Sequence, residues 1–305
     1  MPRASIDLGS NSVLLLVIDD DGKVLHDEAR VVGLGAGLGD RGLLRPDREE
    51  AALAALVDYA ETASGLGVHP WDITTAWTSS GRRALNATGF IQKVEEAARI
   101  RLQVISGDEE ARLTWRGALS GLPLPEGPVA VVDLGGGSTE LVLGEGPRIG
   151  SRVSLELGSV RLTEQFFGVA PVRYRPQDLA KLRAFVDAAF QGHSWQHLPR
   201  ALVAVAGTAT TLAAMELGLT AWDRDVVHGS RLTRAALRRQ IDRLLPTGPR
   251  ERRELAAVSP ERADFLLAGA CVLEAACSAA HKDSLRISDS GVRQGLLLGH
   301  RSGRA

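Results

Sequence analysis

The chain has few of the residues that build disulfides, zinc sites or aromatic stacking surfaces. Its 305 residues include two cysteines and seven histidines, and aromatic residues make up 4%. Cys271 and Cys277 lie in an alanine-rich stretch without metal-site spacing, so we expect buried thiols in a reducing, cytoplasmic environment. The scarcity of aromatic residues also gives no obvious surface on which a nucleobase would stack.

Long apolar runs and a large excess of one charge are also missing. The longest apolar stretches, such as 13–18, are far too short to cross a bilayer, and Asp7 interrupts any secretory signal. The formal net charge of −1 argues against a globally basic nucleic-acid binder. We therefore expect neither membrane nor nucleic acid among the partners of this chain.

One short pattern, by contrast, is present twice. Residues 6–12 read IDLGSNS and residues 132–140 read VDLGGGSTE, each followed by further apolar residues and a turn signal. Each predicts a strand, a tight turn and a second strand, with Asp7 or Asp133 just before the turn. Such turns let backbone N–H groups approach an anion, and the aspartate can hold a divalent cation beside it. The pair of patterns predicts a duplicated domain with phosphate held between the halves.

A second feature repeats at a similar distance. Thr78 follows Asp7 by 71 residues and Thr208 follows Asp133 by 75, and each ends an apolar strand and opens a helix rich in Gly, Ser and Thr. Helix starts of this kind bind anions. Each one alone could be an ordinary capped helix. Four such turns in the same order in two halves favour phosphate binding.

The alternation of strands and helices predicts a mixed α/β fold. A segment with three prolines and two glycines, 121–128, marks the clearest boundary, so we expect domains at 1–124 and 125–305. The last helix could belong to either. Helices are expected at 47–64, 88–99, 106–119, 177–190, 233–245 and 260–280, and strands at 102–105, 201–206 and 285–287.

Hydrolysis of a phosphoanhydride needs donors around the transferred group and a base for the attacking water. The four turns and Arg82 supply donors. Because no histidine lies near a motif, the base must be a carboxylate. The sequence SGDEEARL at 106–113 opens a helix with three acids, and Glu140 is the other candidate. Acids in a first helical turn also simply complement the helix dipole, which suffices for Asp108 and Glu109.

These motifs, with RRALN at 82–86, LGSVR at 157–161 and GTATT at 207–211, resemble the exopolyphosphatase/guanosine pentaphosphate phosphohydrolase family. The resemblance implies two ribonuclease-H-like domains of the actin/sugar-kinase/Hsp70 superfamily, an active site in the interdomain cleft, and Mg²⁺. It places the catalytic glutamate at Glu110, the loop aspartate at Asp133 and the following glutamate at Glu140. Leu14 stands where many members carry a basic residue. The length matches a short member without the appended helical domain.

We therefore expect an exopolyphosphatase that releases orthophosphate from polyphosphate, with short chains preferred. Three alternatives remain. They are a guanosine pentaphosphate phosphohydrolase, an actin-like nucleotide-binding or kinase protein, and a non-catalytic sensor. A homodimer is left open. The expected catalytic residues are Glu110 and Glu140, and the expected metal ligands are Asp7, Asp133 and Glu140. The expected phosphate-binding residues are Ser10, Asn11, Ser12, Arg82, Gly135, Gly136, Gly137, Ser138, Thr139, Gly207 and Thr208.

Overall fold

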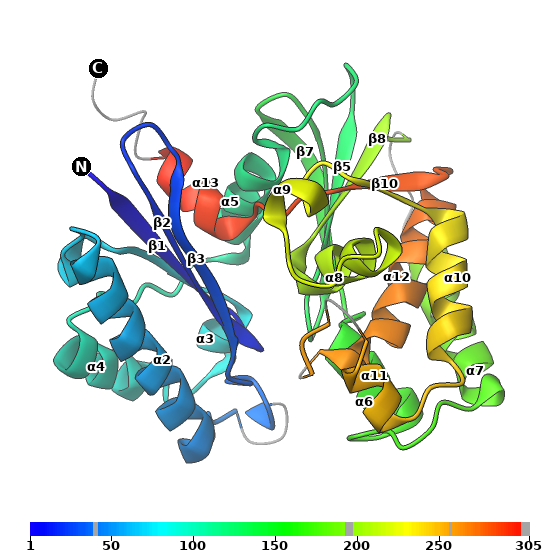
Figure 1. The fold of residues 1–305 in the computed structure, drawn as a ribbon, viewed down its shortest axis with the longest axis horizontal. Helices are drawn as coiled ribbons and strands as arrows, with labels where there is room; N and C mark the ends of the chain where they lie inside the picture. The colour runs from blue at the N-terminus through cyan, green and yellow to red at the C-terminus, as the bar shows by residue number, and fades with distance from the viewer. Residues whose placement is uncertain (39–41, 193–197, 256–257, 261, 300–305) are drawn as a thin grey trace. The chain divides into compact units, whose positions relative to one another are not determined.

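The computed structural model describes residues 1–38, 42–192, 198–255, 258–260 and 262–299. The chain divides into two compact units (Figure 1). The first unit comprises Met1–Gly117 and Val292–Ala305, and the second comprises Ala118–Gly291. The segment 121–128 lies within the second unit, and the domain boundary at 124/125 stays a prediction.

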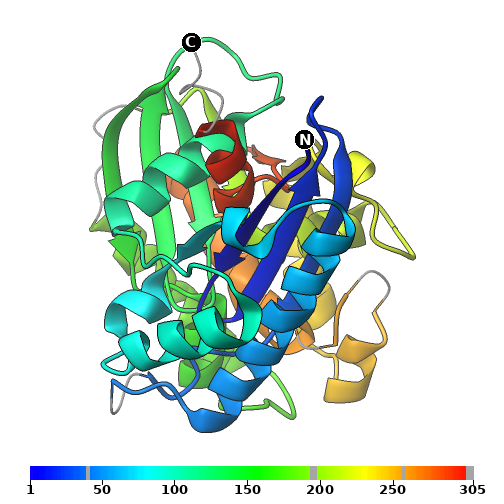
Figure 2. The same ribbon diagram turned by 90° about the vertical axis from the view of Figure 1, so that its left-hand side faces the viewer.

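The first unit is built on a four-stranded sheet of order β3-β2-β1-β4. The strands are β1 (Arg3–Leu8), β2 (Ser12–Ile18), β3 (Val24–Val31) and β4 (Thr74–Trp77). The first three are antiparallel and β4 runs parallel to β1. Ile6 and Leu8 point to one face, into a core shared with α2 (Pro46–Gly65) and α4 (Ala87–Ala98). Figure 2 shows α2, in light blue, lying in front of the dark blue strands.

The opposite face of this sheet is covered by α5 (Gly107–Leu119) and α13 (Val292–Gly299). The Ser5 hydroxyl donates to the carbonyl oxygen of Arg293, and Leu16 packs with Leu297. The last helix thus packs back on the sheet of the first unit. Because side chains alternate along a strand, Asp7 points to this second face with Ser5.

The second unit has a six-stranded sheet of order β7-β6-β5-β8-β10-β9. Its strands are β5 (Val129–Leu134), β6 (Thr139–Glu145), β7 (Arg148–Leu155), β8 (Ala201–Val205), β9 (Arg231–Thr233) and β10 (Ser284–Ile287). Its larger helices are α6 (Ser159–Phe167), α7 (Pro176–Gln191), α8 (Ala206–Glu216), α10 (Arg234–Leu244) and α12 (Leu266–Ala279). The first four strands repeat the order of the first unit, as expected for two ribonuclease-H-like folds.

Several local expectations need correction. The stretch 102–105 forms only one bridge, between Val104 and Trp77, and no strand. Strand β3 was not expected, because its alternating polar residues carry little apolar signal. The helix expected at 260–280 begins at Leu266, after a short 3-10 turn, η2 (Ala263–Phe265). Cys271 and Cys277 are buried in α12 as expected. No helix in the described part of the chain is long and apolar enough to cross a membrane.

Candidate active site

The first turn, between β1 and β2, is fixed through its backbone carbonyls. The amide of Gly9 donates to the carbonyl oxygen of Ser12 at 2.9 Å, which closes the turn. The Ser80 hydroxyl donates to Gly9, and the amide of Gly35 donates to Ser10 at 2.7 Å. The carbonyl of Asn11 accepts from the amides of residues 32 and 33. Three successive carbonyls are therefore bound by neighbouring segments.

This arrangement determines where the amides of the turn point. No described peptide bond is cis, and in a trans peptide the C=O and N–H groups point in opposite directions. The N–H groups of Ser10, Asn11 and Ser12 consequently point away from the segments that hold the carbonyls. Successive amides presented in this way form an anion-binding concavity.

The second turn, between β5 and β6, has the same geometry. The amide of Gly135 donates to the carbonyl oxygen of Ser138 at 3.0 Å, matching the closure of the first turn. The carbonyls of Gly135 and Gly136 accept from amides at the start of α6, and that of Gly137 accepts from Nε of Arg161 at 2.8 Å. By the same argument, the amides of Gly136, Gly137 and Ser138 point away from α6.

Gly158 makes this contact between α6 and the turn possible. A Cβ at this position would lie 2.1 Å from the carbonyl oxygen of Gly136, so only glycine fits. The sequence motif around residue 158 is therefore explained by the close approach of two backbones. Gly158 therefore supports the turn through this packing.

Asp7 is the most buried acidic residue of the candidate site in the first unit. Its Oδ1 is buried and has no hydrogen-bond partner among the residues that the structure describes. Burial, reinforced by the charge of Glu110 and opposed by Arg293, raises the pKa of Asp7 to about 7. A buried carboxylate with an unsatisfied oxygen is costly unless a cation or proton compensates it.

Glu110 is brought to the same face from the first turn of α5. Its backbone amide donates to the carbonyl oxygen of Ser106 at 2.9 Å, while Ser106 Oγ accepts from the amide of Glu109. Nη1 of Arg82 donates to Oε2 of Glu110 at 2.7 Å. Of the two neighbouring glutamates, Glu110 is the more buried, with 17% of its side chain exposed against 48% for Glu109.

Asp133 and Glu140 are paired in the second unit. They lie directly opposite each other in the antiparallel ladder of β5 and β6, so their side chains share one face of the sheet. Oε1 of Glu140 accepts from the hydroxyls of Ser138 at 2.7 Å and Ser154 at 2.9 Å. In the first unit the position opposite Asp7 is Leu14, so the duplication is not complete.

The start of α8 places the remaining predicted residues. Ala206 has φ of +72°, a left-handed conformation that costs an alanine about 1–2 kcal/mol. A Cβ on Gly207 would lie 2.3 Å from Nη1 of Arg262, so this guanidinium lies over the helix start. Arg262 could not be predicted, because it lies in a distant segment without a motif.

Two predicted phosphate-binding side chains face the interior of the second unit. The Thr139 hydroxyl is buried and donates to the carbonyl oxygen of Leu157 at 2.6 Å. Thr208 is buried with its methyl group against Gly269. The Thr139 hydroxyl is bound in this conformation, so a contribution of Thr139 to phosphate binding would come from the backbone.

The carboxylates fit a divalent cation that also binds substrate oxygens. No group of three or more His, Cys, Asp or Glu residues suited to a metal occurs within the described ranges. Each unit instead offers one pair of carboxylates. The pair is Asp7 with Glu110 in the first unit and Asp133 with Glu140 in the second. Magnesium typically takes one or two carboxylates and completes its octahedron with water and phosphate oxygens. The unsatisfied oxygen of Asp7 is the strongest local indication of such a ligand.

Two sheets that share a strand order, each with a glycine- and hydroxyl-rich hairpin turn after an aspartate, are typical of phosphate-binding proteins built from two ribonuclease-H-like domains. Residues 16–302 match the model of the Ppx/GppA phosphatase family. The chain therefore belongs to the Ppx/GppA phosphatase family and is a phosphohydrolase by membership.

Three similar proteins match this chain along nearly its whole length. The chain is 34% identical to exopolyphosphatase 2 of Mycobacterium tuberculosis over 97% of both chains. The crystal structure of the Aquifex aeolicus family member has a TM-score of 0.83 and 31% identity, covering 100% of this chain and 99% of that one. An exopolyphosphatase structure from Cytophaga hutchinsonii has a TM-score of 0.87 and 25% identity, covering 99% and 98%.

Proposed function

We propose that this protein is an exopolyphosphatase that removes terminal orthophosphate from inorganic polyphosphate with Mg²⁺ as its cation. The observation that carries the proposal is the pair of hairpin turns whose amides, at Ser10–Ser12 and Gly136–Ser138, point away from their bound carbonyls. The similarity to an exopolyphosphatase along 97% of the chain supports the choice of substrate.

The proposed chemistry uses a water molecule as the nucleophile. The Glu110 carboxylate accepts a proton from this water as its oxygen bonds to the terminal phosphorus. The bond from that phosphorus to the bridging oxygen breaks, and the shortened chain leaves with the electron pair. Amides of the two turns and the guanidinium of Arg82 donate to the oxygens that gain charge.

The carboxylates have a second role in the proposal. Asp7, Asp133 and Glu140 would hold Mg²⁺, which would neutralise phosphate charge. The hydroxyls of Ser138 and Ser154 fix the carboxylate of Glu140 in one orientation. We assign Glu140 to this electrostatic role, since two hydroxyls already occupy its Oε1, and Glu110, oriented by Arg82, to proton transfer.

Guanosine pentaphosphate is the competing substrate within the family. Recognition of its base would favour an accessible aromatic ring. Trp77 and Trp115, the aromatic residues nearest the motifs in sequence, are both buried in the first unit. This burial favours a substrate without a base.

A phosphate-release assay tests the proposal. Polyphosphate, guanosine pentaphosphate and ATP are each incubated with the protein and Mg²⁺, and orthophosphate is measured. We expect the highest kcat/KM with polyphosphate and loss of activity with a chelator. Preferential release from guanosine pentaphosphate would reassign the substrate, and release from none of the three would reject the proposal.

A further inference from the structure

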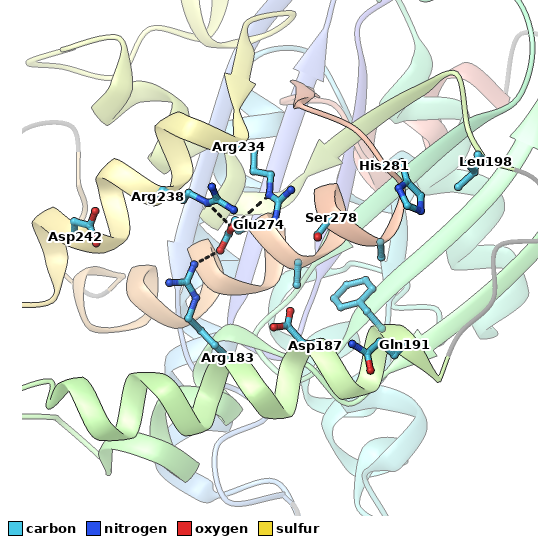
Figure 3. A pocket seen from close by; sticks show the side chains of 13 residues that line it. Arg183, Asp187, Gln191, Leu198, Arg234, Arg238, Asp242, Glu274, Ser278 and His281 are labelled. Atoms are coloured by element: carbon cyan, nitrogen blue, oxygen red, sulfur yellow. Dashed lines mark hydrogen bonds and ion pairs between the residues drawn. The ribbon is translucent and has the colours of Figure 1, made fainter.

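A pocket of about 860 Å³ lies entirely within the second unit, between helices α7, α10 and α12 (Figure 3). Its size is that of a small-molecule site. None of the residues assigned to phosphate or metal binding lines it. The lining residues are Arg183, Asp187, Phe190, Gln191, Leu198, Arg234, Arg238, Asp242, Glu274, Ala275, Ser278, Ala279 and His281.

Three arginines from two helices converge on one carboxylate at one end of this pocket. Glu274 of α12 accepts from Nε of Arg238 at 2.8 Å and from Nε of Arg234 at 3.4 Å, both on α10. Arg183 of α7 pairs with the other oxygen through Nη2. Burial would raise the pKa of Glu274, but the hydrogen bonds from Arg238 and Arg183 outweigh it and hold the pKa below its usual value.

The cluster has more donors than its carboxylate can satisfy. Three guanidinium groups carry about fifteen N–H donors, whereas one carboxylate offers about four acceptor sites. The side chains of Arg183, Arg234 and Arg238 are 38%, 33% and 55% exposed. They therefore present part of each guanidinium to the pocket as well as to Glu274.

Arg252, in the same unit, has the environment of a purely structural arginine, which differs from that of the three pocket arginines. Arg252 is 0% exposed and donates to Asp264, to the carbonyl oxygen of Thr247 and to that of Pro171. Its guanidinium also lies over the ring of Tyr174. Arg252 is enclosed by partners from several segments, whereas the three pocket arginines share one carboxylate and border an open volume.

The rest of the pocket is not suited to a plain polyanion. Asp187 and Asp242 also line it and would repel a chain of phosphates. The same carboxylates, with Gln191, could accept hydrogen bonds from hydroxyl or amino groups. Leu198, 53% exposed, supplies an apolar surface. The lining therefore combines anion donors, acceptors and an apolar surface.

We propose that this pocket binds a small phosphate ester of nucleotide size, separate from the catalytic turns. Its phosphate groups bind Arg183, Arg234 and Arg238, since guanidinium groups suit phosphate geometry. Its hydroxyl or amino groups donate to Asp187 and Asp242, and its ring lies against Leu198.

Helix α12 links this pocket to a predicted phosphate turn. Gly269, near its start, packs against Thr208, and Ser278, near its end, lines the pocket. These two positions are about 13 Å apart at 1.5 Å per residue. A bound ligand at the pocket therefore contacts the same buried helix that supports the start of α8.

Binding of ADP, measured by titration calorimetry, tests the proposal. All proteins carry Glu110→Gln to limit turnover, and saturating long-chain polyphosphate is present to occupy the catalytic turns. Arg238→Gln removes one pocket charge. Ser278→Trp fills the pocket from an exposed position of α12 without entering the core. Arg243→Gln removes an exposed charge from the same helix as Arg238 but outside the pocket.

We expect ADP to bind, with each pocket substitution weakening binding at least about tenfold and Arg243→Gln changing it less than about twofold. No binding of ADP, or binding unaffected by both pocket substitutions, would overturn the proposal. Tripolyphosphate that displaces ADP and binds as tightly would overturn the assignment to a nucleotide. If Arg238→Gln fails to fold, the ADP affinity of Ser278→Trp alone tests the proposal. Phosphate release, assayed separately, reports on the proposed function and not on this pocket.

Discussion

Nη1 of Arg82 lies 2.7 Å from Oε2 of Glu110 and 3.0 Å from the carbonyl oxygen of Ile105. One guanidinium nitrogen therefore holds the proposed base and the segment that precedes its helix. The sequence suggested only that Arg82 grips phosphate. The structure adds a positioning role, because the ion pair fixes the direction of the Glu110 carboxylate.

Arg82→Ala should consequently affect both steps of the reaction. We expect KM to rise through loss of a phosphate contact, and kcat to fall up to about 100-fold because the base is misplaced. Steady-state kinetics with polyphosphate measures both. Arg83→Ala removes the neighbouring exposed arginine and should leave both constants near wild type. An increase in KM with unchanged kcat would show that Arg82 does not position the Glu110 carboxylate.

Asp7→Asn should stabilise the metal-free protein in a pH-dependent way. The pKa of Asp7 is about 7 in the folded protein against 3.8 for a free carboxyl, so the folded state binds the extra proton between these values. Stability therefore falls as pH rises from about 4 to about 7 and stays reduced above that range. Removing the carboxylate should raise Tm at pH 8 and change it little at pH 4.

Thermal unfolding with a chelator at both pH values measures this effect. Glu110 and Arg293 face Asp7 and remain present in the variant. Added Mg²⁺ should raise the Tm of the wild type at pH 8 more than that of Asp7→Asn. Asp72→Asn removes an exposed carboxylate of the same unit as a control. A lower Tm for Asp7→Asn at pH 8 without metal would contradict the interpretation.

Asp133→Asn should raise the Mg²⁺ concentration needed for half-maximal activity. The carboxylate lies opposite Glu140, and its loss leaves one acidic ligand in that pair. We expect a shift of about 10–100-fold, the range seen when residues that support a metal site are lost. Glu145→Gln, at the exposed end of the same strand as Glu140, is the matched control. A metal titration that coincides with wild type would exclude Asp133 as a ligand.

Gly158→Ala should damage the second turn without removing any functional group. The added methyl would lie 2.1 Å from the carbonyl oxygen of Gly136, so backbone must move. We expect a loss of about 1–3 kcal/mol in the free energy of unfolding, together with weaker substrate binding. Gly150→Ala, whose Cβ meets its nearest atom at 3.5 Å, should be tolerated. Equal denaturation midpoints for the two variants would show that the approach is not required.

The hairpins could be predicted from the sequence because their information is local. A glycine and hydroxyl run between apolar stretches specifies the turn, and the matching closures at Gly9 and Gly135 follow from it. The amphipathic pattern of 47–64 likewise predicted α2 within two residues at each end. Strand β3 was not predicted, because an edge strand buries little surface and its polar residues leave no clear apolar pattern.

The environments of the site residues depend on contacts between distant segments. The raised pKa of Asp7 comes from burial and from the charge of Glu110, and Arg293 opposes it; no pattern around residue 7 reveals these neighbours. The close approach at Gly158 and the position of Arg262 over Gly207 are also tertiary contacts. Sequence motifs therefore predicted the two hairpin turns, whereas charge coupling and steric fit needed the folded structure.

Comparing Glu110→Gln with Glu109→Gln tests whether Glu110 is the base for hydrolysis of polyphosphate. The amide keeps the shape of the side chain but cannot accept the proton. We predict that Glu110→Gln lowers kcat for orthophosphate release about 10²–10⁴-fold while polyphosphate binding stays close to wild type. Glu109→Gln, on the exposed side of the helix start, should retain activity. An active Glu110→Gln beside an inactive Glu109→Gln would show that Glu110 is not the base.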